Sequence, residues 1–408
     1  MTFEDAKTRD AADSLAHCRE RFRLPPGKIY LDGNSLGAMP ASVPDRMAEV
    51  IDCEWGDDLI ESWNKHDWMG APERVAGRLA PLVGAEPDEL LITDSTSINL
   101  FKLLGAALAA RPKRSVILSE EGNFPSDLYV AQGMESFVRG SRLQTVPTDA
   151  IAASISDETA VVMLTHIDYR GGGRHDMKAI NAAAHRAGAL TLWDLSHSAG
   201  ALAIDLDGDG CDLAVGCGYK YLNGGPGAPA FLFVARHLGG ELSNPLPGWM
   251  GHAAPFAFDP EYRPCEGIGR FRTGTPSILG ITALEAGLAT FDGVFLTCLE
   301  AKSRSLSELF IGETERRCGG QVRLASPREP EARGSHVVFA HPHGYAVMRA
   351  LIEAGVVGDF REPDLMRFGF APLYNSHQDV WRAAEAIGRI IASGEWDQPR
   401  FHERRRVI

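Results

Sequence analysis

The 408-residue chain is predicted to be an α/β protein: a mostly parallel seven-stranded sheet with helices on both faces, plus a smaller α+β domain. Its length exceeds that of one ordinary compact domain. Hydrophobic residues at 44% and charged residues at 23% are typical of a folded globular protein. Between residues 89 and 234, short β-branched runs alternate with Ala-rich amphipathic stretches, the pattern of βαβ units around a parallel sheet.

Seven short apolar runs are the strand candidates, and each has the length of a buried strand. In chain order they are Leu90–Thr93, Ser115–Leu118, Leu143–Val146, Ala160–Leu164, Leu190–Asp194, Leu213–Gly216 and Ala230–Val234. Two helices between them have clear start signals. Ile98–Ala110 follows an Asp-Ser-Thr-Ser segment, and Met177–Ala187 follows Asp176, residue types that cap helix N-termini.

The alternation of short strand patterns with helical patterns ends at about residue 274. Longer helical stretches follow at Ile278–Phe291 and Leu296–Phe310, with strands near His336–Phe339 and Leu365–Phe370. We therefore expect three parts. These are an N-terminal arm that contributes to the small domain (1–60), a large domain that carries the ligand site (61–273) and a C-terminal small α+β domain (274–408).

Charge and composition exclude several classes of partner. The net charge of −13, without a Lys/Arg-rich face, offers nothing to nucleic acid. The charged first 20 residues lack a signal-peptide core, and no apolar span reaches the roughly 18 residues that cross a bilayer, so we expect a cytoplasmic protein without a membrane partner. The seven scattered cysteines form no C-x-x-C pair, so neither a metal site nor a disulfide framework is predicted.

Polar side chains follow several of the predicted strands. Residues 94–97 bring hydroxyl groups to the start of a helix, a way to hold a phosphate, and Thr165 follows another strand. Asp194 ends a strand, and Lys220 lies in a glycine-rich loop after the next one, 26 residues later (220 − 194). The carboxyl ends of parallel strands share one edge of the sheet, where ligands bind. A lysine for the aldehyde and a carboxylate for the ring nitrogen are what pyridoxal phosphate requires.

Each of these features alone also has a purely structural explanation. Ser/Thr clusters before helices are usually caps, and an Asp that closes a strand is usually a turn residue. A loop lysine is usually solvated, and a single histidine such as His197 is more often a hydrogen-bonded structural residue. The combination of all of them at successive strand ends favours the cofactor site.

Longer motifs resemble those of a known family. They are residues 30–37 (YLDGNSLG), 94–100 (DSTSINL), 123–127 (NFPSD), 193–200 (WDLSHSAG), 218–227 (GYKYLNGGPG), 248–252 (GWMGH) and 367–374 (RFGFAPLY). Over nearly its whole length the chain resembles the kynureninases, within the fold-type-I pyridoxal-phosphate enzymes. The resemblance implies hydrolysis of L-kynurenine to anthranilate and L-alanine in tryptophan degradation. It leaves 3-hydroxy-L-kynurenine, which would give 3-hydroxyanthranilate, as a second candidate substrate.

The resemblance also implies roles for individual residues. Lys220 looks like the Schiff-base lysine that moves the α-proton, Asp194 like the partner of the ring nitrogen, and Tyr219 like an acid/base group. Arg367 resembles the arginine that binds the substrate carboxylate, a bidentate task. The implied cofactor shell is Thr96, Ser97, Phe124, Asp127, Thr165, Asp194, His197, Tyr219, Lys220, Trp249 and Thr275.

Two members of that shell imply a homodimer with the active site at the subunit interface. In the family the phosphate is bound partly from the neighbouring subunit, and Trp249 and Thr275 match those positions. Some relatives carry Asn where this chain has Thr275, which retains a hydroxyl donor. Trp63 and His252 are the candidates for lining the pocket of the aromatic amine.

Two other functions stay open at this point. A cysteine desulfurase or related β-lyase would need a reactive thiol, for which Cys265 and Cys318 are the late candidates. Neither lies in a desulfurase motif, and a buried or bystander thiol is the more usual explanation of each. A pyridoxal-phosphate-binding protein without catalysis would need neither Tyr219 nor Arg367.

Overall fold

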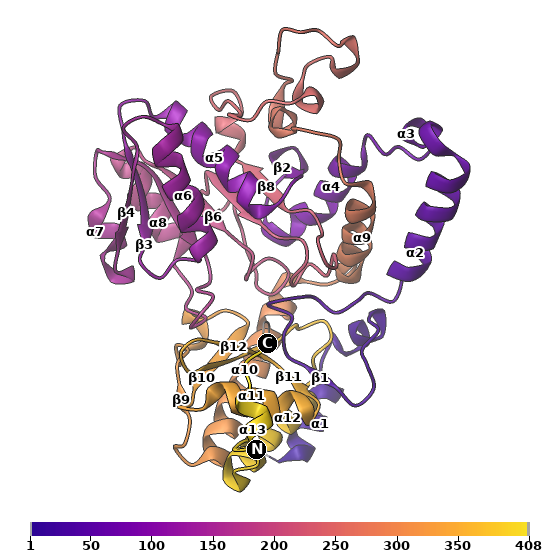
Figure 1. Ribbon diagram of the computed structural model, residues 1–408, viewed down its shortest axis with the longest axis vertical. Helices are drawn as coiled ribbons and strands as arrows, with labels where there is room; N and C mark the ends of the chain where they lie inside the picture. The colour runs from indigo at the N-terminus through magenta and orange to yellow at the C-terminus, as the bar shows by residue number, and fades with distance from the viewer. Residues whose placement is uncertain (1, 406–408) are drawn as a thin grey trace.

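The structure, a computed structural model, describes residues 2–405. Figure 1 shows a large α/β body at one end and a smaller body at the other, with the N-terminal arm running between them. The helices are α1 (Phe3–Ala11), α2 (Val43–Glu49), α3 (Ser62–Lys65), α4 (Ala71–Val83), α5 (Thr96–Ala110), α6 (Pro125–Phe137), α7 (Ile151–Ser154), α8 (Met177–Ala187), α9 (Ile278–Leu288), α10 (Leu296–Cys318), α11 (Gly344–Glu353), α12 (His377–Ser393) and α13 (Pro399–His402).

The large body is built on the predicted seven-stranded sheet, with strand order β2-β8-β7-β6-β5-β3-β4. Every predicted strand is present, with ends that differ by two residues or fewer, and the two antiparallel pairings of this sheet are those of β8 with β2 and with β7. The strands are β2 (Leu90–Ile92), β3 (Val116–Glu120), β4 (Arg142–Val146), β5 (Thr159–Thr165), β6 (Leu190–Asp194), β7 (Leu213–Gly216) and β8 (Phe231–Val234).

Helices cover both faces of this sheet because successive strand residues point to opposite sides. In β5, Val161 and Met163 join the apolar side chains of α5 and α6 in one core. Val162 and Leu164 join α4, α8 and α9 in the core on the opposite face. The sheet is therefore buried on both faces, and its carboxyl edge is left for a site.

The small body holds a four-stranded antiparallel sheet of order β12-β13-β10-β9. Its strands are β9 (Arg323–Leu324), β10 (His336–Ala340), β12 (Asp359–Arg361) and β13 (Leu365–Gly369), with a separate pair β1 (Ile29–Tyr30) and β11 (Val356–Val357). Its core combines this sheet with α10, α11 and α12. The predicted α10 helix is longer than expected: it continues past Phe310 to Cys318 and stops at Gly319, whose φ of +55° suits glycine.

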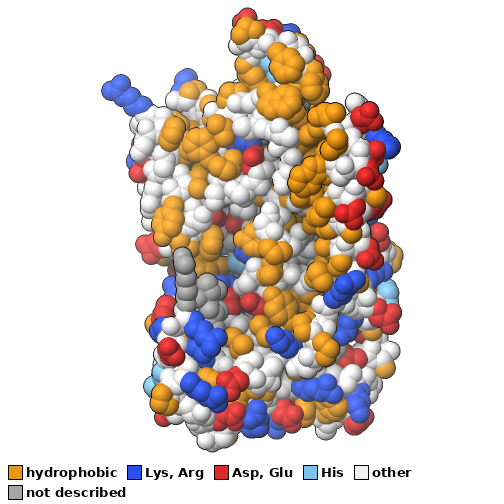
Figure 2. Space-filling view, turned by 45° about the vertical axis from the view of Figure 1, so that its right-hand side comes forward, with side chains coloured by type: hydrophobic (Ala, Val, Ile, Leu, Met, Phe, Trp, Pro, Cys, Tyr) orange, Lys and Arg blue, Asp and Glu red, His pale blue; other side chains and the backbone are white. Residues whose placement is uncertain are grey.

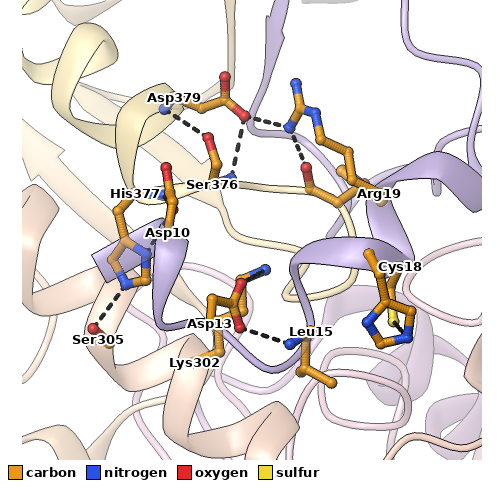
Figure 3. A network of polar contacts seen from close by, with 12 residues as sticks. Asp10, Asp13, Leu15, Cys18, Arg19, Lys302, Ser305, Ser376, His377 and Asp379 are labelled. Atoms are coloured by element: carbon orange, nitrogen blue, oxygen red, sulfur yellow. Dashed lines mark hydrogen bonds and ion pairs between the residues drawn. The ribbon is translucent and has the colours of Figure 1, made fainter. Parts of the chain in front are cut away.

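The N-terminal arm is fastened to the small body by the polar contacts of Figure 3. The Asp10 carboxylate accepts hydrogen bonds from the backbone N–H groups of His377 (2.7 Å) and Gln378 (3.1 Å), the first residues of α12. Asp13 pairs with Lys302 at 2.6 Å, and Arg19 pairs with Asp379. Charges on the arm thus bind the free end of a helix and two groups of the small body.

The expected domain boundaries at residues 60 and 273 stay predictions. Two observations bear on where the chain passes between the bodies. α9 packs on α4, and its Ile281 and Leu284 belong to the core of the large sheet.

Among the described residues no single helix is long and apolar enough to cross a membrane; residues 278–291 and 296–318 pass that test only as a pair bent by 84°.

Candidate active site

A cavity of about 170 Å³ lies at the carboxyl ends of β5, β6 and β7, beside the first turns of α5 and α6. It collects residues from five separate segments of the large body. Its walls are Ser95, Thr96, Ser97, Phe124, Ser126, Asp127, Thr165, Asp194, Ser196, His197, Tyr219 and Lys220. Lys220 and Asp194, predicted from the sequence to share one ligand, therefore line the same cavity.

The Lys220 amine is the centre of this cavity. Its Nζ lies 3.1 Å from Nε2 of His197, 5.8 Å from the centre of the Phe124 ring and 5.9 Å from that of Tyr219. The N-terminal arm packs directly against the backbone of the loop that carries Lys220: a side chain at Gly37 would meet the Lys220 carbonyl oxygen at 2.3 Å. The amine is thus held among aromatic rings by a closely packed backbone.

Two buried carboxyl groups share the cavity. Burial raises the pKa of Asp194, while the Lys220 charge and a hydrogen bond from the Ser196 backbone N–H (2.8 Å) oppose that rise. Burial and the charge of Asp194 raise the pKa of Asp127 well above its usual range. Two charged carboxylates so close together in a buried site would repel each other. The cavity therefore favours a state in which only one of Asp194 and Asp127 is charged, and this one anion can pair with Lys220 or with a cationic ligand.

His197 and Tyr219 are shifted toward their neutral forms. Burial and the nearby charges of Lys220 and Arg367 lower the pKa of His197 well below its usual range. Burial raises the pKa of the Tyr219 phenol, with a smaller contribution from Cys217 and Asp194. Near pH 7 the imidazole is therefore neutral and the phenol keeps its proton, ready to donate it.

One wall of the cavity consists of hydroxyl groups at helix starts. Ser95 caps α5, so Thr96 and Ser97 fall on its first turn, where backbone N–H groups are free. The Ser97 and Ser126 hydroxyl oxygens lie 3.3 Å apart, which joins the starts of α5 and α6. Positive helix ends and hydroxyl donors are suited to a phosphate group.

Arg367 lies on β13 of the small body and is 2% exposed. Its Nε and Nη2 donate to the two Asp359 carboxylate oxygens at 2.8 and 2.5 Å, and Nη1 donates to the Tyr169 carbonyl oxygen at 2.7 Å. The Tyr169 ring in turn meets the Phe124 ring edge-on at 5.2 Å. Arg367 is therefore connected to the cavity through Tyr169, although it is not among the residues of the cavity wall.

Four predicted residues lie apart from the Lys220 cavity. Thr275 lines a neighbouring cavity together with Asp94 and Arg272, and Trp249 is 41% exposed. His252 accepts a hydrogen bond from the Ala254 backbone N–H at 2.9 Å, as an ordinary turn residue does. The Trp63 ring packs edge-on against the Trp68 ring at 5.5 Å.

Sequence reasoning missed several wall residues. Ser126 and Ser196 lie in the cavity wall next to residues that were predicted, whereas Ser95 lies there within the predicted segment 94–97. Asn123 was also missed: its side-chain oxygen accepts from the backbone N–H (3.1 Å) and the hydroxyl of Thr165. The available signal was the position of Ser126 and Ser196 between predicted site residues, and of Asn123 directly before Phe124.

The fold and the lysine–carboxylate cavity define the class first. The structure is similar to a cysteine desulfurase from Thermococcus onnurineus NA1 (TM-score 0.78, 20% identity, 93% of this chain and 98% of that chain). It is also similar to the cystine C-S lyase C-DES (TM-score 0.76, 18% identity, 89% and 98%). The protein therefore has the fold of the fold-type-I pyridoxal-phosphate enzymes, as predicted; likeness at this identity shows the fold alone.

Sequence relatives then define the family. The chain is 49% identical to the kynureninase of Burkholderia mallei (strain SAVP1) over 413 aligned residues, covering 100% of this chain and 99% of that protein. It is 48% identical to the kynureninase of Pseudomonas fluorescens with the same coverage. The family described as kynureninase C-terminal domain matches residues 299–387. The chain belongs to the kynureninase family, which confirms the resemblance seen in its motifs.

Proposed function

We propose that the protein is a pyridoxal-phosphate-dependent kynureninase that hydrolyses L-kynurenine to anthranilate and L-alanine. The observation that carries this proposal is the shared cavity of Lys220 and Asp194 in a member of the kynureninase family. The preference between L-kynurenine and its 3-hydroxy form stays open. A cytoplasmic location stays a prediction.

The cavity fits the cofactor at each of its chemical groups. His197 Nδ1 is buried and, among residues 2–405, has no hydrogen-bond partner, so the cavity has a polar atom left for a ligand. Thr96, Ser97 and the start of α5 would hold the phosphate, and Phe124 would stack on the ring, an aromatic contact worth about 0.5–1.5 kcal/mol beyond its burial. Asp194 would hold the protonated ring nitrogen through a charge-assisted bond.

When bound, pyridoxal phosphate supplies an electron sink for negative charge on the substrate carbon next to the amino group. Lys220 would hold the cofactor aldehyde and, once released, take the proton from that carbon. Burial keeps its neighbour His197 neutral, so the imidazole can form a hydrogen bond with the amine without adding a second positive charge.

Tyr219 and Arg367 would act on the substrate itself. The Tyr219 phenol, kept protonated by burial, would deliver and take back a proton as water adds to the γ-ketone and the β–γ carbon–carbon bond breaks. Arg367 would bind the α-carboxylate and so fix which substrate bond faces Lys220. Thr165, which donates to Asn123 and lies 3.4 Å from Asp127, would hold the wall beside Phe124.

We further propose a homodimer in which Trp249 and Thr275 reach the partner's cofactor, with Trp63 and His252 near the aromatic end of a substrate. Apolar side chains support this: Phe256 and Phe258 are 63% and 77% exposed on the loop that follows Trp249. In Figure 2 hydrophobic side chains gather on this projecting loop and on the face beneath it. Exposed apolar patches of this kind are typical of association surfaces.

The test is to add L-kynurenine to the purified, cofactor-loaded protein and to follow anthranilate by fluorescence and alanine by amino-acid analysis. We expect the two products in equal amounts, and none from Lys220→Ala. A protein that shows the yellow absorption of bound cofactor and leaves kynurenine unchanged would contradict the proposal and favour the non-catalytic alternative.

A desulfurase activity is less well supported. Cys318 is 1% exposed on α10, as the more usual explanation of a buried thiol predicted, and burial raises its pKa to about 11. Cys265 is half-buried with a raised pKa, and neither thiol is among the residues of the Lys220 cavity wall. A reactive thiol needs the opposite environment.

A further inference from the structure

Lys102 is a fully buried cation on the second turn of α5. Its side chain is 0% exposed, and its ammonium group donates to the Asp94 carboxylate and to the Phe271 carbonyl oxygen (2.7 Å). A charge this deep is retained only when it is paired and hydrogen-bonded. The two acceptors belong to segments 177 residues apart in sequence (271 − 94), which meet at this amine.

The first segment leads into the hydroxyl wall of the active-site cavity. Asp94 has a φ of +46°, in the left-handed region that is unfavourable for a residue with a side chain. Its carboxylate accepts from Lys102 and from the Thr93 hydroxyl (2.8 Å), and its carbonyl accepts from the Ala230 backbone N–H (2.9 Å). Ser95, Thr96 and Ser97 follow directly, so this turn sets the direction of their hydroxyl and N–H groups.

The second segment carries the residues proposed for the partner's cofactor. Phe271 is buried, and four residues later comes Thr275. Thr273 lies against Gly248, where a side chain would meet the Thr273 carbonyl oxygen at 2.1 Å, and Trp249 follows that glycine. The contact of Lys102 with Phe271 therefore anchors a segment that packs directly against the one carrying Trp249.

We propose that Lys102 is a positioning residue for the phosphate end of the cofactor: one buried ammonium group fixes the strained turn before α5 and ties it to residues 271–275. The inference rests on the proposed function, since it takes the cofactor as given. Lys102 would act through Asp94 on one side and through the Phe271 backbone on the other. It would thereby link the phosphate contacts of one subunit to those that the same subunit offers to its partner.

The test uses Lys102→Met, which keeps the length of the side chain, and compares two ligands. Dissociation constants are measured by equilibrium dialysis for pyridoxal phosphate and for pyridoxal, which lacks the phosphate. We expect the constant for pyridoxal phosphate to rise about tenfold, because misplacement of binding groups by about 1 Å has effects of this size or larger. The constant for pyridoxal should change less than twofold. Lys178→Met, at an exposed lysine of α8, is the matched control.

A second variant separates positioning from stability. Lys102→Met leaves the Asp94 carboxylate without its cation, which destabilises the fold, whereas Asp94→Asn with Lys102→Met removes the unpaired charge. The double variant should regain most of the melting temperature but not the affinity for pyridoxal phosphate. Equal losses for both ligands, or recovery of affinity together with stability, would overturn the inference. Failure to cleave kynurenine with intact phosphate selectivity would instead contradict the proposed function.

Discussion

Arg367 and Asp359 face each other across two antiparallel strands and form a two-contact ion pair that is almost completely buried. The carboxylate fixes the plane of the guanidinium, and Ser35 donates to the same carboxylate at 2.9 Å. Nε and both Nη groups thus have acceptors, and among residues 2–405 the structure gives a partner to one of the two N–H bonds of Nη1. The orientation of Arg367, which we propose to bind the substrate carboxylate, is therefore set by Asp359 and Tyr169 before a substrate arrives.

Arg367→Lys should therefore weaken substrate binding more than it changes cofactor binding. A lysine ammonium group cannot keep both contacts to Asp359 and also present a donor where Nη1 lies, so we expect KM for L-kynurenine to rise about 10–100-fold. The absorption of the bound cofactor should keep its position. Steady-state kinetics and spectra of the variant check this, with Arg389→Lys on the exposed side of α12 as control. An unchanged KM would show that another group binds the carboxylate.

Asp194→Asn and Asp127→Asn should differ, because only one carboxylate of the pair is expected to carry charge. The pKa of Asp127 is raised well above its usual range, so an amide imitates its neutral form. Loss of the Asp194 charge removes a charge-assisted bond worth about 1.5–3 kcal/mol, or roughly 10–150-fold in turnover. Asp127→Asn should cost less than about tenfold. The reverse order in kcat would assign the charge to Asp127.

The sequence predicted the sheet and most of the cavity because both depend on local patterns. Buried strands are short apolar runs, and a ligand site at their carboxyl edge leaves polar residues such as Thr165 and Asp194 directly after them. Thr96, Phe124, His197 and Lys220 were found in the same way or by their motifs, and all of them line the cavity.

The remaining features depend on contacts between distant segments, which a single sequence does not encode locally. In the sequence, Lys102 is a single charged residue in an apolar helix, which does not indicate a partner. Its contacts with Asp94 and Phe271 form only in the folded structure. The pairing of Asp359 with Arg367 depends on the strand register of the small body. The burial of Cys318 likewise depends on α10 continuing past Phe310 to Cys318 and packing in the core of the small body.

Cys265→Ser should leave the kynurenine reaction nearly unchanged. The thiol is not in the Lys220 cavity wall, and its pKa is raised by burial, so it is a poor nucleophile. We expect kcat/KM for L-kynurenine within about twofold of the wild type, the usual range for a substitution outside the chemistry. Sulfide release from L-cysteine should be absent in both proteins. Sulfide production that disappears in Cys265→Ser would revive the desulfurase alternative.

His166 should make folding stability depend on pH in a defined direction. Burial lowers its pKa from 6.5 to about 3. Between these two pH values the imidazole is protonated in the unfolded chain but stays neutral in the folded protein. Stability contributed by the neutral form is therefore full above pH 6.5 and falls as the pH drops toward 3, by at most about 1.4 kcal/mol per pH unit. His166→Gln should show a shallower loss between pH 6 and 4.5 in urea unfolding. Parallel curves for the two proteins would contradict this assignment.

Asp10→Asn should loosen the N-terminal arm, since the carboxylate binds both the His377 ring (2.9 Å) and the first N–H groups of α12. These contacts lower the pKa of Asp10 from 3.8 to about 2 against the opposing effect of burial. The stabilisation is present above pH 3.8 and is lost as the pH falls toward 2. The Asp10 side chain is 14% exposed, and we expect a loss of about 1 kcal/mol near neutral pH, the usual size for a lost helix cap. The melting temperature should fall by a few degrees, and trypsin should cut more rapidly at Arg9 or Arg19.

Glu4→Gln, at an exposed carboxylate on α1, provides the comparison: equal effects of the two substitutions would show that the Asp10 contacts do not hold the arm.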